Sequence, residues 1–379
     1  MANPYIQWER SKQLDLGLEL GLFKNALFIN VEPYQKVSDQ MLFEKELPLS
    51  SGLAEVNHYK PSQVINTGRI TNTGLDISLT YKGNVNDFKY SLSANISTVN
   101  YKVNELADNN PLLRSEVLAD GVQVSKTTVG EGSGYFFGYQ CDGIFQTQEQ
   151  VDEYHNNARA IAKERNPGLS ESALANIFYN GSANTAPGDL IFRDLNGDGI
   201  ITPLDREKIG SPWPKATYGL QFTANYKEID LLITSSGVYG RDVFNVSKVQ
   251  MYQFSSYDYS TTTLALSRWT PENHSTTNYR IEGKDPNKNM SNPSSWYIED
   301  GSFFRIKNLE LGYTIPSVLT NKIGISRLRI YMSGQNLLTV TKYTGFDPEF
   351  GIGNAISSGV DYGSHPQSKV YMMGLQVEF

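Results

Sequence analysis

Hydrophobic and polar residues alternate with a period of two along several stretches of the chain. From 13 to 20 a leucine stands at every second position, between Gln, Asp, Gly and Glu, and similar alternation runs through 74–81, 88–96 and 218–226. Successive side chains of a β-strand point to opposite faces, so each stretch would form a strand with one apolar face and one polar face. The pattern predicts an all-β chain.

The expected strands are separated by connections that are alternately short and long. About nine strands are predicted, at 10–23, 26–37, 65–81, 88–103, 215–226, 229–240, 301–313, 326–338 and 369–379. The shorter connections fall at 22–25, 82–87, 227–228 and 314–325, and the long ones at 38–64, 104–214, 241–300 and 339–368. Bacterial transmembrane barrels have short periplasmic turns, long extracellular loops and strands of about ten residues, so this alternation favours such a barrel.

An odd number of strands does not close a single-chain barrel of this class, which needs an even number. An open sheet would leave unpaired backbone groups in lipid, at a cost of about several kcal/mol for each group. We therefore expect the C-terminal part of a large antiparallel transmembrane β-barrel, and we expect the chain to be incomplete by itself.

Alternation alone would also fit a soluble β-sandwich, and that alternative stays open. The mean hydropathy is −0.40, and no run approaches the ~18 consecutive apolar residues of a spanning helix, which excludes a helical membrane protein. The formal charge of −7 offers no basic surface to nucleic acid. The chain does not open with a charged segment followed by an apolar run, so we expect either a soluble protein or a true N-terminus elsewhere.

Nucleophilic and metal-binding side chains are sparse. Cys141 is the only cysteine, which excludes internal disulfides and cysteine-based zinc sites. The histidines at 58, 155, 274 and 365 fall in predicted loops, without the spacing of metal ligands or a partner nucleophile. The sequence therefore predicts no enzyme.

Residues 194–205 form an Asp-rich loop, the one pattern in the sequence that suggests binding of a metal ion. Oxygen-bearing side chains fall at loop positions 1, 3 and 5, a glycine at position 6 permits a sharp turn, and a carboxylate stands at position 12. These offsets predict a structural Ca²⁺ site, held by Asp194, Asn196, Asp198, the Ile200 carbonyl, Thr202 and Asp205. A hairpin of Asx turns without metal would use the same residues, and this alternative stays open.

The longest connection, 104–214, is expected to be an extracellular loop insertion that holds the Asp-rich loop and a short amphipathic helix at 147–165. That helix would pack over the barrel mouth or against a partner, or it would simply be solvated. Aromatic residues of the predicted loops could stack on sugar rings through their apolar faces, or they could pack within the loops. The stacking candidates are Trp269, Trp296 and Tyr257.

Six phrases, in order from residue 3 to residue 379, carry a family resemblance. They are Asn3-Pro4 with Trp8-Glu9 and 16–23, then GYQCDGIF at 138–145, GDLIFRDLNGDG at 188–199, FRIKNLELGYTIP at 304–316, QNLL at 335–338 with YTGFDPE at 343–349, and the last strand after Pro366-Gln367. Together they resemble the SusC/RagA family of TonB-linked outer-membrane proteins, over essentially the whole chain.

The resemblance implies nutrient uptake across the bacterial outer membrane. Such proteins form a barrel in outer-membrane lipid beneath a SusD-like lipoprotein lid, and they import oligosaccharides or peptides with energy that TonB delivers through an N-terminal plug region. No plug domain is found in 1–379, so we expect it to lie upstream of Met1. The alternative function is a soluble or surface-attached all-β module that binds glycans or mediates adhesion and carries a calcium loop.

The last predicted strand ends in an aromatic residue, Phe379. It shares one face with Tyr371, Met373 and Leu375, opposite Gly374 and Gln376. Such an ending resembles the signal read by the outer-membrane assembly machinery. An ordinary edge strand that happens to end in Phe is the alternative.

Overall fold

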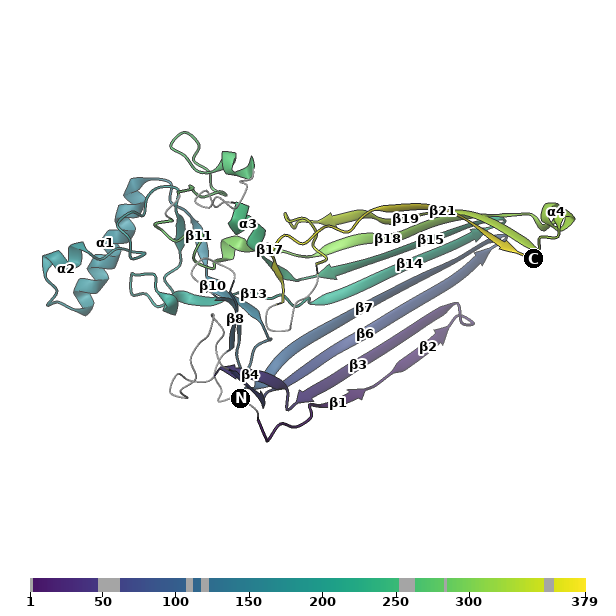
Figure 1. Cartoon of the computed structure of the whole chain (residues 1–379), viewed down its shortest axis with the longest axis horizontal. Coiled ribbons are helices and arrows are strands. Elements are labelled where there is room, and N and C mark those ends of the chain that lie inside the picture. Colours follow the sequence, from purple (N-terminus) through teal and green to yellow (C-terminus); the bar gives the residue numbers. More distant parts are fainter. Residues whose placement is uncertain are drawn as a thin grey trace.

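The computed structural model describes residues 3–46, 62–106, 112–116, 123–251, 263–282, 285–350 and 358–379. Ten of its strands form one large sheet: β1 (Arg10–Asp15), β2 (Leu18–Leu22), β3 (Leu27–Asp39), β6 (Arg69–Val85), β7 (Phe88–Glu105), β14 (Ala216–Tyr226), β15 (Ile229–Tyr239), β18 (Phe303–Ile315), β19 (Arg327–Thr341) and β21 (Val370–Glu378). Their order is β1-β3-β6-β7-β14-β15-β18-β19-β21, with β2 also paired to β3. We call this sheet the wall (Figure 1).

The predicted fold class is confirmed, because neighbouring strands of the wall are antiparallel and follow one another in chain order. The observed bounds differ from the predicted ones by a few residues. β6 spans Arg69–Val85 where 65–81 is predicted, and β19 spans Arg327–Thr341 where 326–338 is predicted. Alternation of side chains therefore located the strands well and their ends less well.

One predicted strand, 10–23, is divided into β1 and β2, and both parts pair with β3. Between the two parts the Leu16 amide donates to the Pro33 carbonyl at 3.1 Å. Pro33 has no N–H with which to return a hydrogen bond, so the ladder is broken at this point. Because β1 and β2 lie end to end beside β3, the wall has nine strand positions across it.

The two faces of the wall differ in chemistry. On one face Tyr371, Met373 and Leu375 are 74%, 71% and 67% exposed. Met373 lies beside Met332, which in turn lies beside Leu311, so the apolar face continues from strand to strand. We call this the outer face. The opposite, inner face carries polar side chains such as Asp76, which lies between Glu32 and Ser97 of the neighbouring strands.

The short connections gather at one end of the wall. The hairpin turns there need left-handed backbone, with positive φ at Phe23, Asn86 and Lys227. Between β18 and β19 the connection contains α4 (Ser317–Thr320) and η7 (Asn321–Ile323). Exposed aromatic rings stand on or beside the strands near this end: Tyr81, Phe88, Tyr226 and Tyr313.

Tyrosine rings cover glycines across neighbouring strands of the wall. At each of these places a Cβ added to the glycine would lie 2.5 Å or less from the tyrosine ring, so no larger residue fits under it without movement. The pairs are Tyr34 over Gly74, Tyr90 over Gly83, Tyr218 over Gly237 and Tyr331 over Gly374, each directly opposite in the register.

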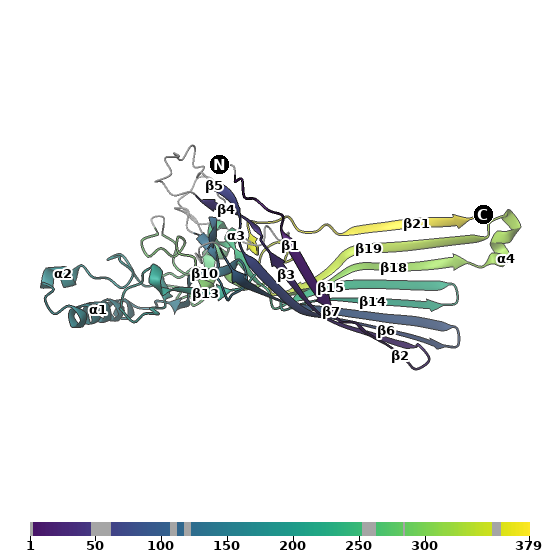
Figure 2. The ribbon, with the colours of Figure 1, turned by 90° about the horizontal axis from the view of Figure 1, so that it is seen from below.

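The long connections meet at the other end and form a second region, which we call the body (Figures 1 and 2). Its strands are β4 (Leu42–Glu46), β5 (Ser62–Asn66), β8 (Leu112–Glu116), β9 (Gln123–Thr127), β10 (Tyr135–Tyr139), β11 (Cys141–Ile144), β12 (Leu190–Phe192), β13 (Arg206–Gly210), β16 (Asp242–Asn245), β17 (Ile298–Asp300) and β20 (Val360–Asp361). They form small sheets, of which β13-β10-β9-β8 is the largest.

The helices of the body lie in its loops. They are α1 (Gln148–Arg165), α2 (Glu171–Ala175), α3 (Val246–Met251), η4 (Pro203–Asp205), η5 (Thr263–Ser267) and η6 (Ser295–Tyr297). α1 matches the predicted helix, and its N-cap Thr147 accepts a hydrogen bond from the Gln150 amide. No helix in the described part of the chain is both long and apolar enough to cross a membrane.

The largest hydrophobic core cluster among the described residues lies in the body. Phe136, Phe192, Phe244 and Tyr297 are essentially inaccessible to solvent and belong to one cluster with Trp269. The wall has no second layer of comparable size among the described residues, and many of its apolar side chains stay exposed, apart from a small buried cluster at Ile70 and Val103.

Candidate functional site

The Asp-rich loop lies against helix α1. Arg165 of α1 donates to the Gly197 carbonyl at 3.0 Å. Gly199, at loop position 6, has a φ of +81°, and a Cβ added there would lie 2.8 Å from the Ala158 Cα. Both its left-handed backbone and the closeness of the helix require glycine at this point.

Backbone amides orient the carboxylates of the loop. Asp194 accepts hydrogen bonds from the amides of Gly197 and Gly199, at 2.8 and 2.6 Å. Asp205 is fully buried and accepts from the Leu195 amide at 3.0 Å. Ligand oxygens of Asp194, Asp198 and Asp205 all lie within 4.8 Å of one another. Three anionic oxygens this close repel one another unless a cation lies among them.

The other predicted ligands stand around these carboxylates. The Asn196 side chain accepts from the Asp198 amide at 2.8 Å, and the Ile200 amide donates to Asp198 at 2.9 Å. The Thr202 hydroxyl lies 3.2 Å from Asp205 and caps η4. These hydrogen bonds also describe a hairpin of Asx turns, so the geometry is compatible with both sequence hypotheses.

The aromatic residues predicted to stack on sugars are placed as follows. Trp269 is 9% exposed and stacks on His274, with 5.4 Å between ring centroids. Trp296 packs against Tyr279, and the Lys248 ammonium lies 3.7 Å from its ring centroid. Tyr257 lies outside the described residues. Their stacking role stays a prediction.

Phe379 follows β21 at the end of the wall that carries the short turns (Figure 1). Its side chain is 94% exposed, whereas Val377, two residues earlier, is 40% exposed. Nothing within the described residues covers the terminal ring, and its role as an assembly signal stays a prediction.

The inner face of the wall carries an ion-pair cluster near the short-turn end. Arg329 of β19 donates through Nε to Asp230 of β15 at 2.9 Å, and its Nη2 also bonds Asp230. The same Nη2 bonds Glu310 of β18 at 2.7 Å. The inner-face carboxylates Asp230 and Glu310 are therefore joined by one cation, across three neighbouring strands.

A second ion-pair cluster joins the wall to a loop of the body. Arg305 of β18 is 3% exposed and bonds Asp347 at 2.5 Å and Glu349 at 2.9 Å. Burial alone would raise the pKa of Asp347, but the amides of Gln367 and Glu349 and the Arg305 guanidinium hold it below its usual range. The loop is thereby fixed to the inner face of the wall.

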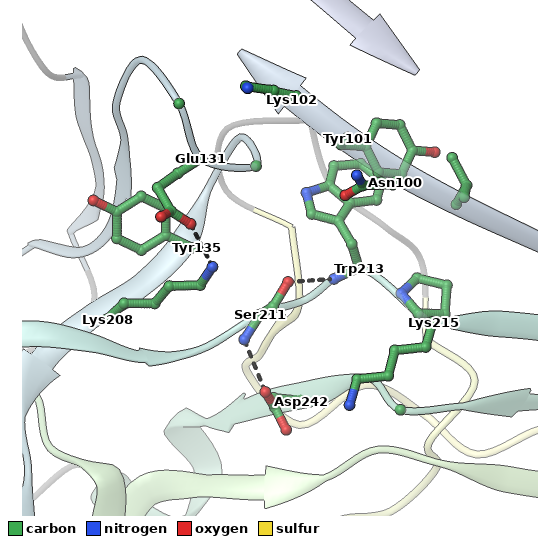
Figure 3. Close-up of a pocket in the computed structure, with 15 residues that line it drawn as sticks. Asn100, Tyr101, Lys102, Glu131, Tyr135, Lys208, Ser211, Trp213, Lys215 and Asp242 are labelled. Carbon is green, nitrogen blue, oxygen red and sulfur yellow. Dashed lines mark hydrogen bonds and ion pairs between the residues drawn. The ribbon is translucent and has the colours of Figure 1, made fainter. Parts of the chain in front are cut away.

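A hollow of about 460 Å³ lies where β7 and β14 separate. We call it the mouth pocket and define it by Tyr101, Glu131, Lys208, Trp213, Lys215 and Asp242 (Figure 3). The paired register of β7 and β14 ends at Thr98 and Ala216, and the next hydrogen bonds on this edge of β7 join Val103 to Gly130 and Glu131. The pocket lies in the gap between the β7–β14 pairing and these hydrogen bonds of Val103.

The groups that line the mouth pocket are held by their neighbours. The Tyr101 and Trp213 rings pack with 4.2 Å between centroids, and Lys208 bonds Glu131 at 2.5 Å. Figure 3 shows Ser211 between Trp213 and Asp242, and the Asp242 carboxylate accepts the Ser211 amide at 2.8 Å. Burial raises the pKa of Asp242, although the Ser211 amide and Lys215 oppose this.

Sequence reasoning missed the mouth pocket. Tyr101 stands just before the long 104–214 insertion and Trp213 stands at its C-terminal end, and no motif connects them. The only signal was that each stands beside the end of a predicted strand, next to lysines at 102 and 215. Their contact arises because the insertion leaves the wall from β7 and returns to it at β14, and these two strands are neighbours.

Comparison with known proteins places the chain in a family. The β-barrel of TonB dependent receptor-like proteins matches residues 1–190. TonB-dependent receptor P3 of Formosa agariphila is 31% identical over the whole chain, and TonB-dependent receptor SusC of Bacteroides thetaiotaomicron is 21% identical. Among solved structures, the RagAB peptide transporter matches the whole chain with a TM-score of 0.74 and 24% identity, which supports the fold.

The chain spans about a third of the length of these relatives: 35% of receptor P3, 32% of SusC and 36% of the matched RagAB chain. The similarity is therefore to one part of larger proteins, although it covers every region of this chain. The resemblance to SusC/RagA-type proteins is confirmed, and the chain belongs to the TonB-dependent receptor family.

Proposed function

We propose that the natural polypeptide containing this chain imports oligosaccharides or other nutrients, such as peptides, across the bacterial outer membrane. The observation that carries the proposal is the wall, because its outer face is apolar and exposed while its inner face holds charged groups. Lipid suits the first face and a water-filled channel suits the second. Membership of the TonB-dependent receptor family supports the same function.

The proposed partners follow from this function. The body stands at the end of the long loops, where a SusD-like lipoprotein lid would sit over the channel. TonB would act through a plug region that belongs to the whole protein. Outer-membrane lipid would cover the outer face, and the exposed Phe379 ring would be read by the assembly machinery.

Uptake in living cells tests the proposal. We expect cells that lack the gene to lose uptake of at least one labelled oligosaccharide or peptide, and depletion of TonB to abolish the same uptake. A set of glycan and peptide nutrients that enters equally well with and without the gene contradicts it. Phe379→Lys should reduce membrane insertion of the protein, whereas Phe379→Tyr should preserve it.

The alternative function is a soluble or surface-attached module for glycan binding or adhesion. The exposed apolar side chains of the wall's outer face argue against it. A soluble module would have to expose residues such as Met373 and Tyr371 to water, at about 25 cal/mol for each Å² of apolar surface. Extraction separates the two functions. A channel requires detergent for release from membranes, and release by a salt or carbonate wash favours the module.

We also propose that the Asp-rich loop holds a structural Ca²⁺ ion. The clustering of ligand oxygens from Asp194, Asp198 and Asp205 within 4.8 Å supports it. Removal of calcium with a chelator should lower the thermal stability of the body, and Asp198→Asn should weaken the response. Equal melting curves with and without millimolar calcium, in protein first freed of bound metal, would contradict the site.

A further inference from the structure

His155 of helix α1 is a buried titratable side chain that the proposed import function does not use. It is 7% exposed, and its ring packs edge-on against the Phe178 ring, with 5.3 Å between centroids. Its Nδ1 accepts a hydrogen bond from the Tyr179 amide at 3.1 Å. An amide N–H can only donate, so Nδ1 carries no proton and the neutral ring holds its single proton on Nε2. The fold therefore selects the uncharged form of this histidine.

The groups around the ring oppose a positive charge on it. Burial lowers the pKa of His155, and the Arg159 guanidinium, one turn further along α1, lowers it again. Arg159 is held in place, because its Nε donates to the Ile177 carbonyl at 3.2 Å. Asp152 of the same helix acts on the pKa in the opposite direction. The segment 177–180, which packs on the ring, contains no charged residue.

Tyr179 connects the histidine to the Asp-rich loop. Its amide donates to His155, and its carbonyl accepts from the Ile201 amide at 2.7 Å. Its phenol is buried and donates to the Phe192 carbonyl, which fixes the residue within the body. Ile201 stands inside the Asp-rich loop, directly before the predicted ligand Thr202. A change at the histidine is therefore two hydrogen bonds away from the loop.

Helix α1 contacts the same loop at two further points. A Cβ added to Gly199 would lie 2.8 Å from the Ala158 Cα, and Arg165 donates to the Gly197 carbonyl at 3.0 Å. Helix positions 155, 158 and 165 are three and seven residues apart, so they lie on one side of the helix. Among these three attachments only His155 titrates near neutral pH.

We propose that His155 makes the hold of the Asp-rich loop on Ca²⁺ sensitive to pH. A proton on Nδ1 removes the acceptor of the Tyr179 amide and sets two N–H donors against each other. The Tyr179 backbone then no longer fixes Ile201, and the loop loses its alignment on α1. This inference rests on the calcium site proposed above and adds its regulation: the ion is held near neutral pH and released in acid.

The direction and size of the effect follow from the pKa of the histidine. Its ordinary pKa is about 6.5, and the packed body lowers it. Affinity for calcium is therefore full above about pH 6.5 and falls as the pH drops below that value. At pH 5.5 a loop that must keep His155 uncharged loses about tenfold in affinity, since one pH unit is a factor of ten. Carboxylates with an ordinary pKa of about 4 stay mostly ionised at this pH.

Calcium titration of the natural polypeptide tests the inference. The protein is purified in detergent and freed of metal, and calcium chloride is titrated by calorimetry at pH 7.5 and 5.5. The heat that Asp198→Asn removes is assigned to the loop. We expect the wild-type affinity to fall about tenfold between the two pH values. His155→Asn places an amide oxygen at the position of Nδ1, so it keeps an acceptor for the Tyr179 amide and should change about twofold or less.

A matched control separates this histidine from histidines in general. His274 is exposed and stacks on Trp269, away from the hydrogen bonds of Tyr179. His274→Asn should retain the tenfold fall in calcium affinity. Thermal melting at pH 7.5 checks that each variant is folded, and His155→Gln, which also offers an amide oxygen, serves as a second variant at the same position.

Two results would overturn the inference: a wild-type affinity that is equal at both pH values, or a tenfold fall that His155→Asn and His155→Gln both retain. Either result leaves the calcium site itself in place. A wild-type protein that binds no calcium in its loop at pH 7.5 contradicts the site, and the regulation fails with it. None of these results bears on import, which the uptake measurements test separately.

Discussion

The wall and the body use the same apolar residue types in opposite ways. In the wall, Tyr371, Met373 and Leu375 point away from the protein and stay mostly exposed. In the body, Phe136, Phe192 and Tyr297 are buried within one hydrophobic cluster. The wall therefore depends on a solvent that accepts apolar side chains, and the body carries its own core.

The charged residues of the wall and the body also differ in their surroundings. In the wall, Asp230 and Glu310 line the inner face and share Arg329. In the body, Asp189 is 1% exposed and is paired with Arg280 at 2.6 Å. In the wall the charged side chains line the polar inner face, and in the body they hold loops together. Variants that move a charge between these environments can break or sharpen the comparison.

The largest effect is expected where the two regions meet. Arg305→Met leaves Asp347 buried without its main cation, and we expect a loss of about 3–5 kcal/mol in unfolding free energy. The measurement is the denaturant midpoint in micelles. The control is Arg327→Met, since the Arg327–Glu378 pair is about half exposed and contributes about 1 kcal/mol or less. Similar losses for both variants would show that the junction is not special.

A charge on the outer face of the wall should have the next largest effect. Under the proposed function Leu92→Arg would place a cation in lipid, and we expect a cost of about 2–4 kcal/mol for a position near the bilayer midplane. Ser91→Arg, one residue earlier on β7 and on the inner face, is the matched control. Refolding into lipid vesicles measures both. A wall that faces water on both sides would tolerate them equally.

Within the body, the contact between the Asp-rich loop and α1 gives a smaller effect. Gly199→Ala must place a Cβ against Ala158 and keep a positive φ, so we expect a loss of about 2 kcal/mol or more. Gly197→Ala has a similar φ of +67° but open space around its Cβ, so its cost should be about 1 kcal/mol. Thermal melting measures both, and equal shifts would contradict close packing of loop on helix.

The smallest effect is expected at the surface of the body. Lys163 on α1 bonds Glu171 on α2 at 3.2 Å, and the two side chains are 58% and 87% exposed. Lys163→Gln should change the unfolding free energy by about 0.5 kcal/mol or less, because water screens the pair. A larger shift of the melting temperature would mean that the two helices depend on this contact.

Patterning predicted the wall more successfully than the body. Alternating side chains were enough to place β14 and β15 within about a residue of their observed bounds, because each strand has one apolar face and one polar face. The break between β1 and β2 was missed, although Pro33 inside a predicted strand was its signal. A proline removes a donor without changing the hydrophobic pattern, so patterning alone passes over it.

The candidate sites show the same division. The Asp-rich loop was recognised because all its predicted ligands lie within twelve consecutive residues, 194–205. The Arg305–Asp347 pair and the Tyr101–Trp213 contact join residues far apart in the chain. Such contacts depend on how loops fold over the wall, and neither periodicity nor spacing encodes them.

The tyrosines that cover glycines in the wall have a consequence for how the sequence can change over time. Tyr331 and Gly374 occupy one shared space, so a larger residue at 374 is tolerated only if the ring at 331 is lost in the same lineage. The same holds for Tyr90 and Gly83. Each pair should therefore change together among descendants, and a drift of one partner alone should be removed by selection.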